Sequence, residues 1–139
     1  MNILKILTPK RIVGNVGERA ARRYLRRHGY KILETNLVSG DNEVDIIVRR
    51  KNVIAYVEVK TRNVEHTSLY EPRPASSVDE KKQRAIIRVA TNYHAYHGND
   101  KRARFDVIEV LLKSGKVDKI NHLEGAFNKN TAYTRRYEK

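Results

Sequence analysis

The chain has 139 residues, which is long enough for one domain and too short for two ordinary ones. Its 29 lysines and arginines outnumber its 16 acidic residues and give a net charge of +13, so we expect a polyanionic partner, most commonly nucleic acid. It has no cysteine, which excludes disulfides, thiol catalysis and cysteine-ligated zinc and fits a cytoplasmic protein. No apolar run approaches the roughly 20 residues that cross a bilayer, so we expect neither a membrane span nor a signal peptide. The alternatives for the charge are a merely soluble basic protein and one that binds acidic membrane surfaces.

A helix is predicted over residues 13–28, because apolar residues recur there at three- and four-residue steps. Gly29 is expected to end it. Glu18 lies at the border of the apolar face, from which it can reach toward whatever the helix packs on. The opposite face is most simply solvated surface, with phosphate contact as the alternative. That face carries Arg19, Arg22, Arg23, Arg26 and Arg27.

Strands are predicted before and after a second helix, over residues 30–37, 43–50, 53–62, 102–112 and 117–127, the last of them short. The second helix is expected to begin at a capping box, Ser77-Val78-Asp79-Glu80, and to run to about His97. This order predicts an α/β fold with a mixed central sheet flanked by helices. The domain would occupy residues 13–127, between an N-terminal extension (1–12) and a basic C-terminal tail (128–139).

The second and third strands carry charges at positions that a buried strand normally avoids. If Lys51-Asn52 is a two-residue turn, Asp45 lies opposite Glu58, and Glu43 lies opposite Lys60. Directly opposed residues share a face of the sheet, so all four charges would project from one side. The other side would be apolar, with Val44, Ile46, Val48, Val57 and Val59.

Two directly opposed carboxylates repel unless something positive lies between them. Mg²⁺ is the obvious candidate, because it is usually held by one or two carboxylates together with water and substrate phosphate. Lys60 would point at the same place, where we expect it to position a water or offset phosphate charge rather than act as a general base. The alternative is a surface salt-bridge cluster in which Lys60 only neutralises the acids.

Asp45 followed by Glu58-Val59-Lys60 on the next strand resembles the PD-(D/E)XK signature of restriction-endonuclease-like nucleases. More closely, the chain resembles the YraN-like family of small bacterial proteins, and archaeal Holliday-junction resolvases are a more distant match. The matching pieces lie between about residues 14 and 127. They are GERAARRYLRRHGYKILETN, NEVDIIV, YVEVKTR, RFDVI and NHLEGAF.

The resemblance implies a restriction-endonuclease-like core of helix, three strands, helix and strand, and a phosphodiester-cleaving site that uses Mg²⁺ or Mn²⁺. It assigns Asp45 and Glu58 as metal ligands and Lys60 as the catalytic lysine. It adds Glu18 as a further metal ligand or water-holding group, and the main-chain carbonyl of Val59 as another ligand. Candidate nucleic-acid contacts are Arg62 beside the site, with Arg19, Arg22, Lys81 and Arg84 on the helices.

Other side chains give weaker signals. His94 and His97 lie three apart on the second helix and are better explained as ordinary helix residues than as metal ligands. Gln83 could face the site, as a glutamine does in some related nucleases. Tyr93 is expected in the core. Tyr96, Tyr133 and Tyr137 are available for stacking on bases.

The leading hypothesis is a metal-dependent nuclease that hydrolyses DNA phosphodiester bonds, with branched or damaged structures in repair or recombination as candidate substrates. One alternative is a non-catalytic nucleic-acid-binding module that retains the nuclease fold. Another is a structural or partner-binding protein in which the charge cluster is incidental. The sequence leaves open DNA against RNA, endonuclease against exonuclease, and a homodimer.

Overall fold

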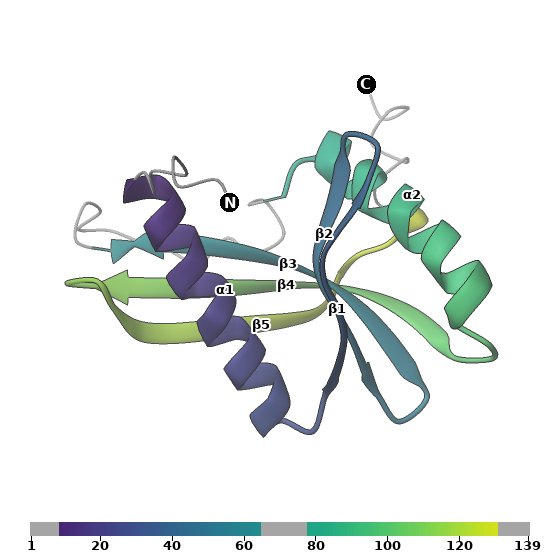
Figure 1. Cartoon of the computed structure of the whole chain (residues 1–139), viewed down its shortest axis with the longest axis horizontal. Coiled ribbons are helices and arrows are strands. Elements are labelled where there is room, and N and C mark those ends of the chain that lie inside the picture. The colour runs from purple at the N-terminus through teal and green to yellow at the C-terminus, as the bar shows by residue number, and fades with distance from the viewer. Residues whose placement is uncertain (1–8, 65–77, 131–139) are drawn as a thin grey trace, which may run out of the picture.

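A computed structural model describes residues 9–64 and 78–130, with side chains from Gly14 onward. These residues form helices and strands in the predicted order, and the expected α/β fold with a mixed sheet flanked by helices is confirmed (Figure 1). The elements are α1 (Pro9–Arg27), β1 (Lys31–Ser39), β2 (Asn42–Arg50), β3 (Val53–Asn63), α2 (Glu80–His97), β4 (Arg102–Lys113) and β5 (Lys116–Phe127). The arrangement is compatible with a restriction-endonuclease-like fold.

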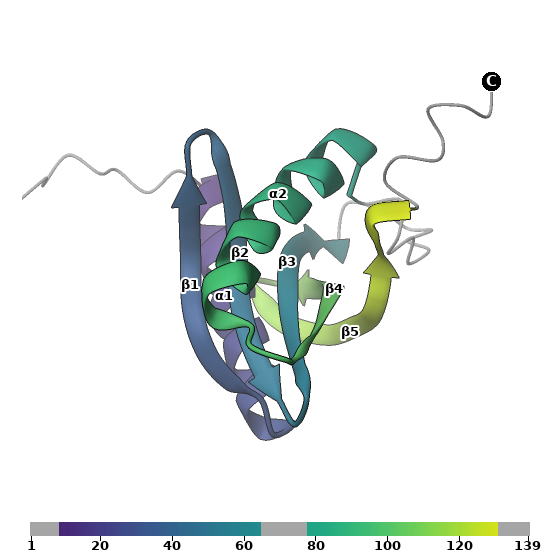
Figure 2. The ribbon, with the colours of Figure 1, turned by 90° about the vertical axis from the view of Figure 1, so that its right-hand side faces the viewer.

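The five strands follow one another across the sheet in chain order. β3 and β4 run parallel, with α2 as the connection between them, and the other neighbours are antiparallel. The two helices lie on opposite faces of the sheet, as the two perpendicular views show (Figures 1 and 2). Neither helix in the described part of the chain is long and apolar enough to cross a membrane.

Helix α1 begins at Pro9, four residues before the predicted start, and ends as predicted at Gly29. Gly29 has a φ of +83°, which glycine adopts without steric cost. The Tyr30 amide donates to the Leu25 carbonyl at 3.0 Å, and the Gly29 amide donates to the Arg26 carbonyl at 3.2 Å. These two bonds are the pattern of a Schellman cap, and they turn the chain directly into β1.

Helix α2 ends at His97 as expected but begins later than the predicted capping box. Its N-cap is Asp79, whose side chain accepts a hydrogen bond from the Lys82 amide at 2.8 Å. The prediction that the cap starts at Ser77 is therefore wrong, and Ser77 itself lies outside the described residues. Strand β5 is also longer than expected, because it pairs with β4 along most of its length.

The β2–β3 hairpin has the predicted register. Arg50 pairs with Val53 across a two-residue turn in which Lys51 has a φ of +53°. The ladder continues to the pair Ile46–Val57 and stops there. Figure 1 shows why the pairing ends, since the β1–β2 hairpin runs across the sheet while β3 curves to follow β4.

Both faces of β2 and β3 are buried, so the expected division into one charged and one apolar face is only partly correct. The α1 face has the predicted apolar residues except Val44. Val44 packs instead in the cluster under α2, together with Ile47, Ile54 and Tyr56. Asp45 and Glu58 therefore lie at one end of a largely apolar face that α2 covers.

Candidate metal centre

The candidate site lies where β2 and β3 separate. Asp45 and Glu58 would form the next pair beyond Ile46–Val57, but the printed ladder does not include them. In its place, the Val59 amide donates a hydrogen bond to Asp45 Oδ2 at 2.8 Å. The aspartate side chain thus joins the two strands where their backbones part, and it holds its carboxylate next to Glu58.

Glu58 is the least satisfied acid of this site. Only 5% of the residue is exposed, and its Oε2 is buried with no hydrogen-bond partner in the described part of the chain. Its Oε1 lies 3.8 Å from the Lys60 ammonium. Burial and then the negative charge of Asp45 raise the pKa of Glu58 to about 8, although Lys82 and Lys60 oppose the shift.

Glu18 reaches the same region from α1. The helix can approach β3 closely because Gly17 has no side chain, and a Cβ there would collide with the side chain of Thr61. Burial, followed by the charges of Asp45 and Glu43, raises the pKa of Glu18. The predicted border position of Glu18 on the helix therefore brings it within electrostatic reach of the β2–β3 acids.

The donor set fits a cation held by two carboxylates better than one held by three. No group of three histidine, aspartate or glutamate side chains within residues 9–64 and 78–130 is arranged to hold a metal ion. Asp45 and Glu58 nevertheless offer adjacent carboxylates, and the buried Glu58 Oε2 lacks a partner. Mg²⁺ is commonly held by one or two carboxylates, with water and substrate completing its shell. A ligand role for Glu18 and for the Val59 carbonyl stays a prediction.

Lys82 is a residue of the site that the sequence analysis missed. It stands in the first turn of α2, where Asp79 caps its amide, and its charge lowers the pKa of Glu58 more than Lys60 does. A signal for it existed in the sequence. Lys82 lies four residues after Val78 and four before Ile86, so it is a lysine on the otherwise apolar stripe of the helix.

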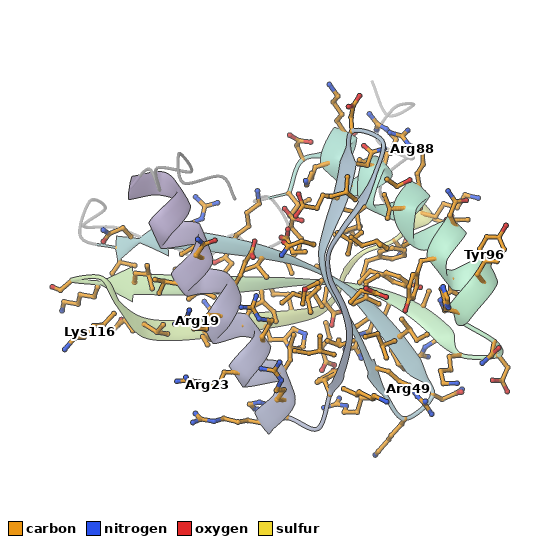
Figure 3. The ribbon with its side chains drawn as sticks, in the orientation of Figure 1. Arg19, Arg23, Arg49, Arg88, Tyr96 and Lys116 are labelled. Atoms are coloured by element: carbon orange, nitrogen blue, oxygen red, sulfur yellow. The ribbon has the colours of Figure 1, made fainter. Side chains whose placement is uncertain are left out.

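The predicted nucleic-acid contacts differ in their surroundings. Arg19, Arg62 and Lys81 are exposed, and Arg19 lies on α1 with Arg23 (Figure 3). Arg22 instead lies 4.0 Å from Glu18, one turn earlier on the same helix. Arg84 likewise approaches Glu80 on α2, at 3.9 Å.

The secondary candidates of the second helix have structural roles. Gln83 is buried and donates to the Val78 carbonyl at 2.8 Å, so the suggestion that it faces the site is wrong. His94 has both ring nitrogens engaged, with the Tyr56 hydroxyl at 2.8 Å and the Lys101 carbonyl at 2.7 Å. Tyr93 packs against the α2-side core as expected. Tyr96 is exposed, and Tyr133 and Tyr137 lie outside the described residues.

A second buried acid, Asp106, lies on the α1 side of the sheet and was not predicted. Its carboxylate accepts hydrogen bonds from the Arg104 guanidinium at 2.8 and 2.9 Å, from His122 Nε2 at 2.8 Å and from the Gly125 amide at 3.0 Å. Burial would raise the pKa of Asp106, but these bonds outweigh it and lower the pKa. His122 Nδ1 in turn lies 3.2 Å from the Tyr24 hydroxyl of α1.

Comparison with known proteins places this geometry in a family. The model of an uncharacterised protein family, UPF0102, matches residues 17–110. A UPF0102 protein of Caldanaerobacter subterraneus subsp. tengcongensis is 43% identical over 121 residues, which cover 85% of this chain and 96% of the relative. One from Chlorobium phaeobacteroides is 39% identical over 122 residues, covering 84% and 93%. One from Caldicellulosiruptor bescii is 43% identical over 118 residues, covering 83% and 96%.

Proposed function

The chain belongs to UPF0102, the YraN-like family, and we propose that it is a metal-dependent nuclease that hydrolyses phosphodiester bonds in DNA. The observation that carries this proposal is the pair of adjacent carboxylates of Asp45 and Glu58. One of them is buried with an oxygen that has no hydrogen-bond partner in the described structure. Such a pair lacks compensating charge, and a divalent cation would supply it.

In this proposal, Asp45 and Glu58 hold Mg²⁺ or Mn²⁺. The bound ion offsets negative charge on the phosphate under attack. Lys60 lies next to Glu58 and keeps its proton beside the two acids, so its role is to orient the phosphate or the attacking water. Glu18, at the edge of the site, holds that water by hydrogen bonding.

The charge of the chain supports a nucleic-acid substrate. A net charge of +13 favours a polyanion, and exposed arginines lie on α1 close to the element that carries Glu18 (Figure 3). Such contacts go to the phosphate backbone and do not read base sequence. We therefore propose a substrate chosen by DNA structure, with branched or damaged DNA in repair or recombination as the candidates.

A cleavage assay tests the proposal. The protein is incubated with Mg²⁺, and separately with Mn²⁺, on linear duplex, single-stranded, flap and four-way-junction DNA. We expect metal-dependent cutting, and a loss of about 100-fold or more in Asp45→Asn and in Glu58→Gln. Asp118→Asn is the matched control, because it removes one exposed carboxylate of β5 away from the site.

Two outcomes would contradict the nuclease proposal. Cutting that survives in both site variants would place the activity elsewhere or in a contaminant. Salt-sensitive DNA binding with no cutting of any substrate would instead favour the non-catalytic binding module.

A further inference from the structure

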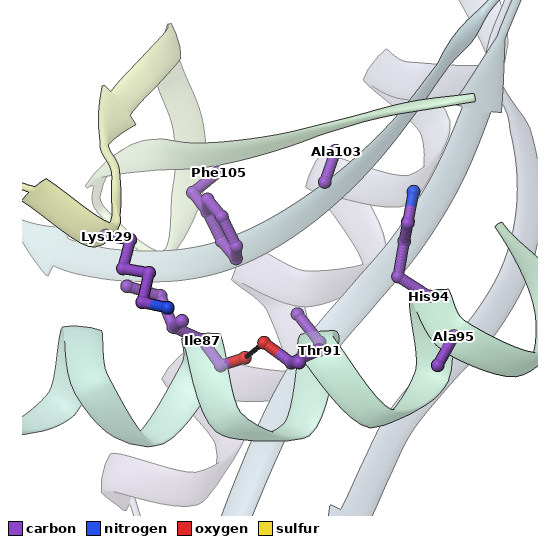
Figure 4. Close-up of a pocket in the computed structure, with 8 residues that line it drawn as sticks. Ile87, Thr91, His94, Ala95, Ala103, Phe105 and Lys129 are labelled. Atoms are coloured by element: carbon purple, nitrogen blue, oxygen red, sulfur yellow. Dashed lines mark hydrogen bonds between the residues drawn. The ribbon is translucent and has the colours of Figure 1, made fainter. Parts of the chain in front are cut away.

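A cavity of about 370 Å³ opens between α2 and the start of β4 (Figure 4). Along α2 it is lined by Ala90, Thr91 and Ala95, and on the β4 side by Ala103 and Phe105. Lys129 stands at one end. No residue of this cavity was a candidate for binding in the sequence analysis.

The cavity exists because small side chains meet where a helix packs on a sheet. Interfaces of this kind are normally filled to the density of a crystal, and a void costs the dispersion contacts of its lining. Three of the lining residues are alanines, Ala90, Ala95 and Ala103, whose side chains are too short to meet across the gap. A volume of this size lies in the range of small-molecule binding sites.

The polar groups on the wall already have partners. The Thr91 hydroxyl donates to the Ile87 carbonyl at 2.7 Å, as the dashed line in Figure 4 shows. His94 Nε2 lies beside a carbonyl oxygen and must donate to it, so Nδ1 accepts from the Tyr56 hydroxyl. The wall is therefore apolar in effect. Lys129 makes no ion pair with any residue of the described ranges, and it offers an ammonium to a ligand at the mouth of the cavity.

The cavity lies on the same face of the sheet as Glu58. Phe105 pairs with Tyr56 across the parallel β3–β4 ladder, and their rings stack with centroids 5.6 Å apart. Glu58 follows Tyr56 by two residues, which is about 7 Å along a strand and on the same side. One face of α2 spans both places, with Lys82 near Glu58 and Ala90 about 12 Å further along the helix axis.

We propose that this cavity binds one unstacked base of the nucleic-acid substrate, with a neighbouring phosphate at Lys129. The proposal rests on the proposed function for its substrate class. An apolar slot with a cation at its mouth is complementary to a flat base joined to an anionic backbone. The surrounding charge agrees, because Arg88 and Lys81 are exposed on the same helix. A preference for unpaired or distorted DNA would follow, since a paired base cannot enter.

The test compares two strands of equal charge. A fluorescent single-stranded oligothymidylate and a strand of the same length made of abasic sugar phosphates are titrated with the full chain. EDTA is present, so that hydrolysis plays no part. We expect the strand with bases to bind about tenfold more tightly, which is within the range of base contacts with aromatic side chains.

Filling the cavity should remove this preference and leave the backbone contacts. We expect Ala95→Leu to bind both strands with the affinity that the wild type shows for the abasic strand. The same variant should unfold at a higher urea concentration than the wild type, because it fills a void, so a failure to fold cannot imitate the result. Asn92→Leu adds the same side chain to an exposed position of α2 outside the cavity, and it should keep the preference. Lys129→Ala should weaken binding of both strands more than Lys116→Ala, which removes an exposed lysine at the start of β5.

Equal binding of the two strands by the wild type, or no binding of either, would overturn the proposal. So would a base preference that persists in Ala95→Leu. The methyl NMR signals of Ala95 and Ala103 give an independent reading, because adenosine monophosphate should shift them. If Tyr133→Ala or Tyr137→Ala shifts them without a nucleotide, the chain's own C-terminal residues fill the cavity and the proposal falls. A base preference without cleavage in the metal-dependent assay would remove the nuclease and leave the base site standing.

Discussion

Glu58 and Asp106 are buried acids on neighbouring parallel strands, and they face opposite sides of the same sheet. Asp106 is fully buried and accepts hydrogen bonds from Arg104, His122 and the Gly125 amide, which lower its pKa. Glu58 is nearly as buried, yet one of its oxygens lacks a hydrogen-bond partner in the described structure and its pKa is raised to about 8. Two carboxylates with similar burial therefore prefer opposite protonation states near neutral pH.

The difference separates a structural acid from a candidate ligand. At Asp106 the cost of removing a charge from water is offset by donors that belong to the protein, so nothing further is needed. At Glu58 the nearby Lys60 and Lys82 do not fully offset burial and the charge of Asp45. A proton relieves this in the free protein, and we propose that a divalent cation does so in the active one.

The strongest way to break the comparison is to remove the structural acid. Asp106→Ala leaves the mostly buried Arg104 guanidinium without its bidentate partner. We expect the free energy of unfolding to fall by about 3–5 kcal/mol, the usual cost of removing one member of a buried ion pair. Urea denaturation at neutral pH measures this, with Asp118→Ala as the exposed control. A loss below about 1 kcal/mol would show that the network is not a stabilising unit.

Glu58 should have the opposite sign in the absence of metal. Its pKa is about 8 in the folded chain and near the ordinary 4.5 when unfolded. Between these values the unfolded chain loses its proton first, so the free energy of unfolding falls as pH rises, and the full penalty is reached above about pH 8. Glu58→Gln cannot ionise, and we expect it to exceed the wild type by on the order of 2–3 kcal/mol at about pH 9 but not at about pH 4. Urea denaturation in EDTA across this range measures the difference, and parallel pH profiles for the two proteins would contradict it.

Metal binding sharpens the comparison through the same proton. If a cation and a proton compete for Glu58, Mg²⁺ affinity should rise by about tenfold, or about 1.4 kcal/mol, for each pH unit below about 8. Isothermal titration calorimetry in two buffers of different ionisation enthalpy would count the protons released. Affinity that does not change between about pH 6 and pH 8 would separate Glu58 from the metal.

The smallest effect expected is at the edge of the Asp106 network. Tyr24→Phe removes the hydroxyl that lies 3.2 Å from His122 Nδ1 and keeps the ring. We expect a loss of about 1 kcal/mol in the free energy of unfolding and no change in Mg²⁺ affinity. A change in metal affinity would mean that the two faces of the sheet are coupled through α1.

The charged hairpin could be predicted because its causes are local. A two-residue turn at Lys51-Asn52 and strict alternation fix the register, and the register sets Asp45 beside Glu58. The end of that ladder could not be predicted, since it depends on the curvature that β3 takes from its pairing with β4. The helix start was missed for a different reason. Ser77 and Asp79 are both good N-cap residue types, and local sequence does not separate them.

The Asp106 network could not be predicted from any pattern along the chain. Its hydrogen bonds join Tyr24 with His122, 98 positions apart, and Arg104 with Tyr30, 74 positions apart. Only the sheet order and the packing of α1 bring these residues together. RFDVI and NHLEGAF were recognised as matching pieces without a physical reason for them, and their polar members prove to be parts of this network.

The hydrogen bond from the Val59 amide to Asp45 has a consequence for ion selection. It fixes the side chain during folding, so its rotamer entropy is already lost before any ligand arrives. It also occupies Oδ2, which leaves Oδ1 as the oxygen free of that bond. A carboxylate with no freedom to swing suits a small ion that demands near-ideal octahedral geometry, as Mg²⁺ does. It suits Ca²⁺ less, because Ca²⁺ is bound by larger and more adaptable sets of oxygens.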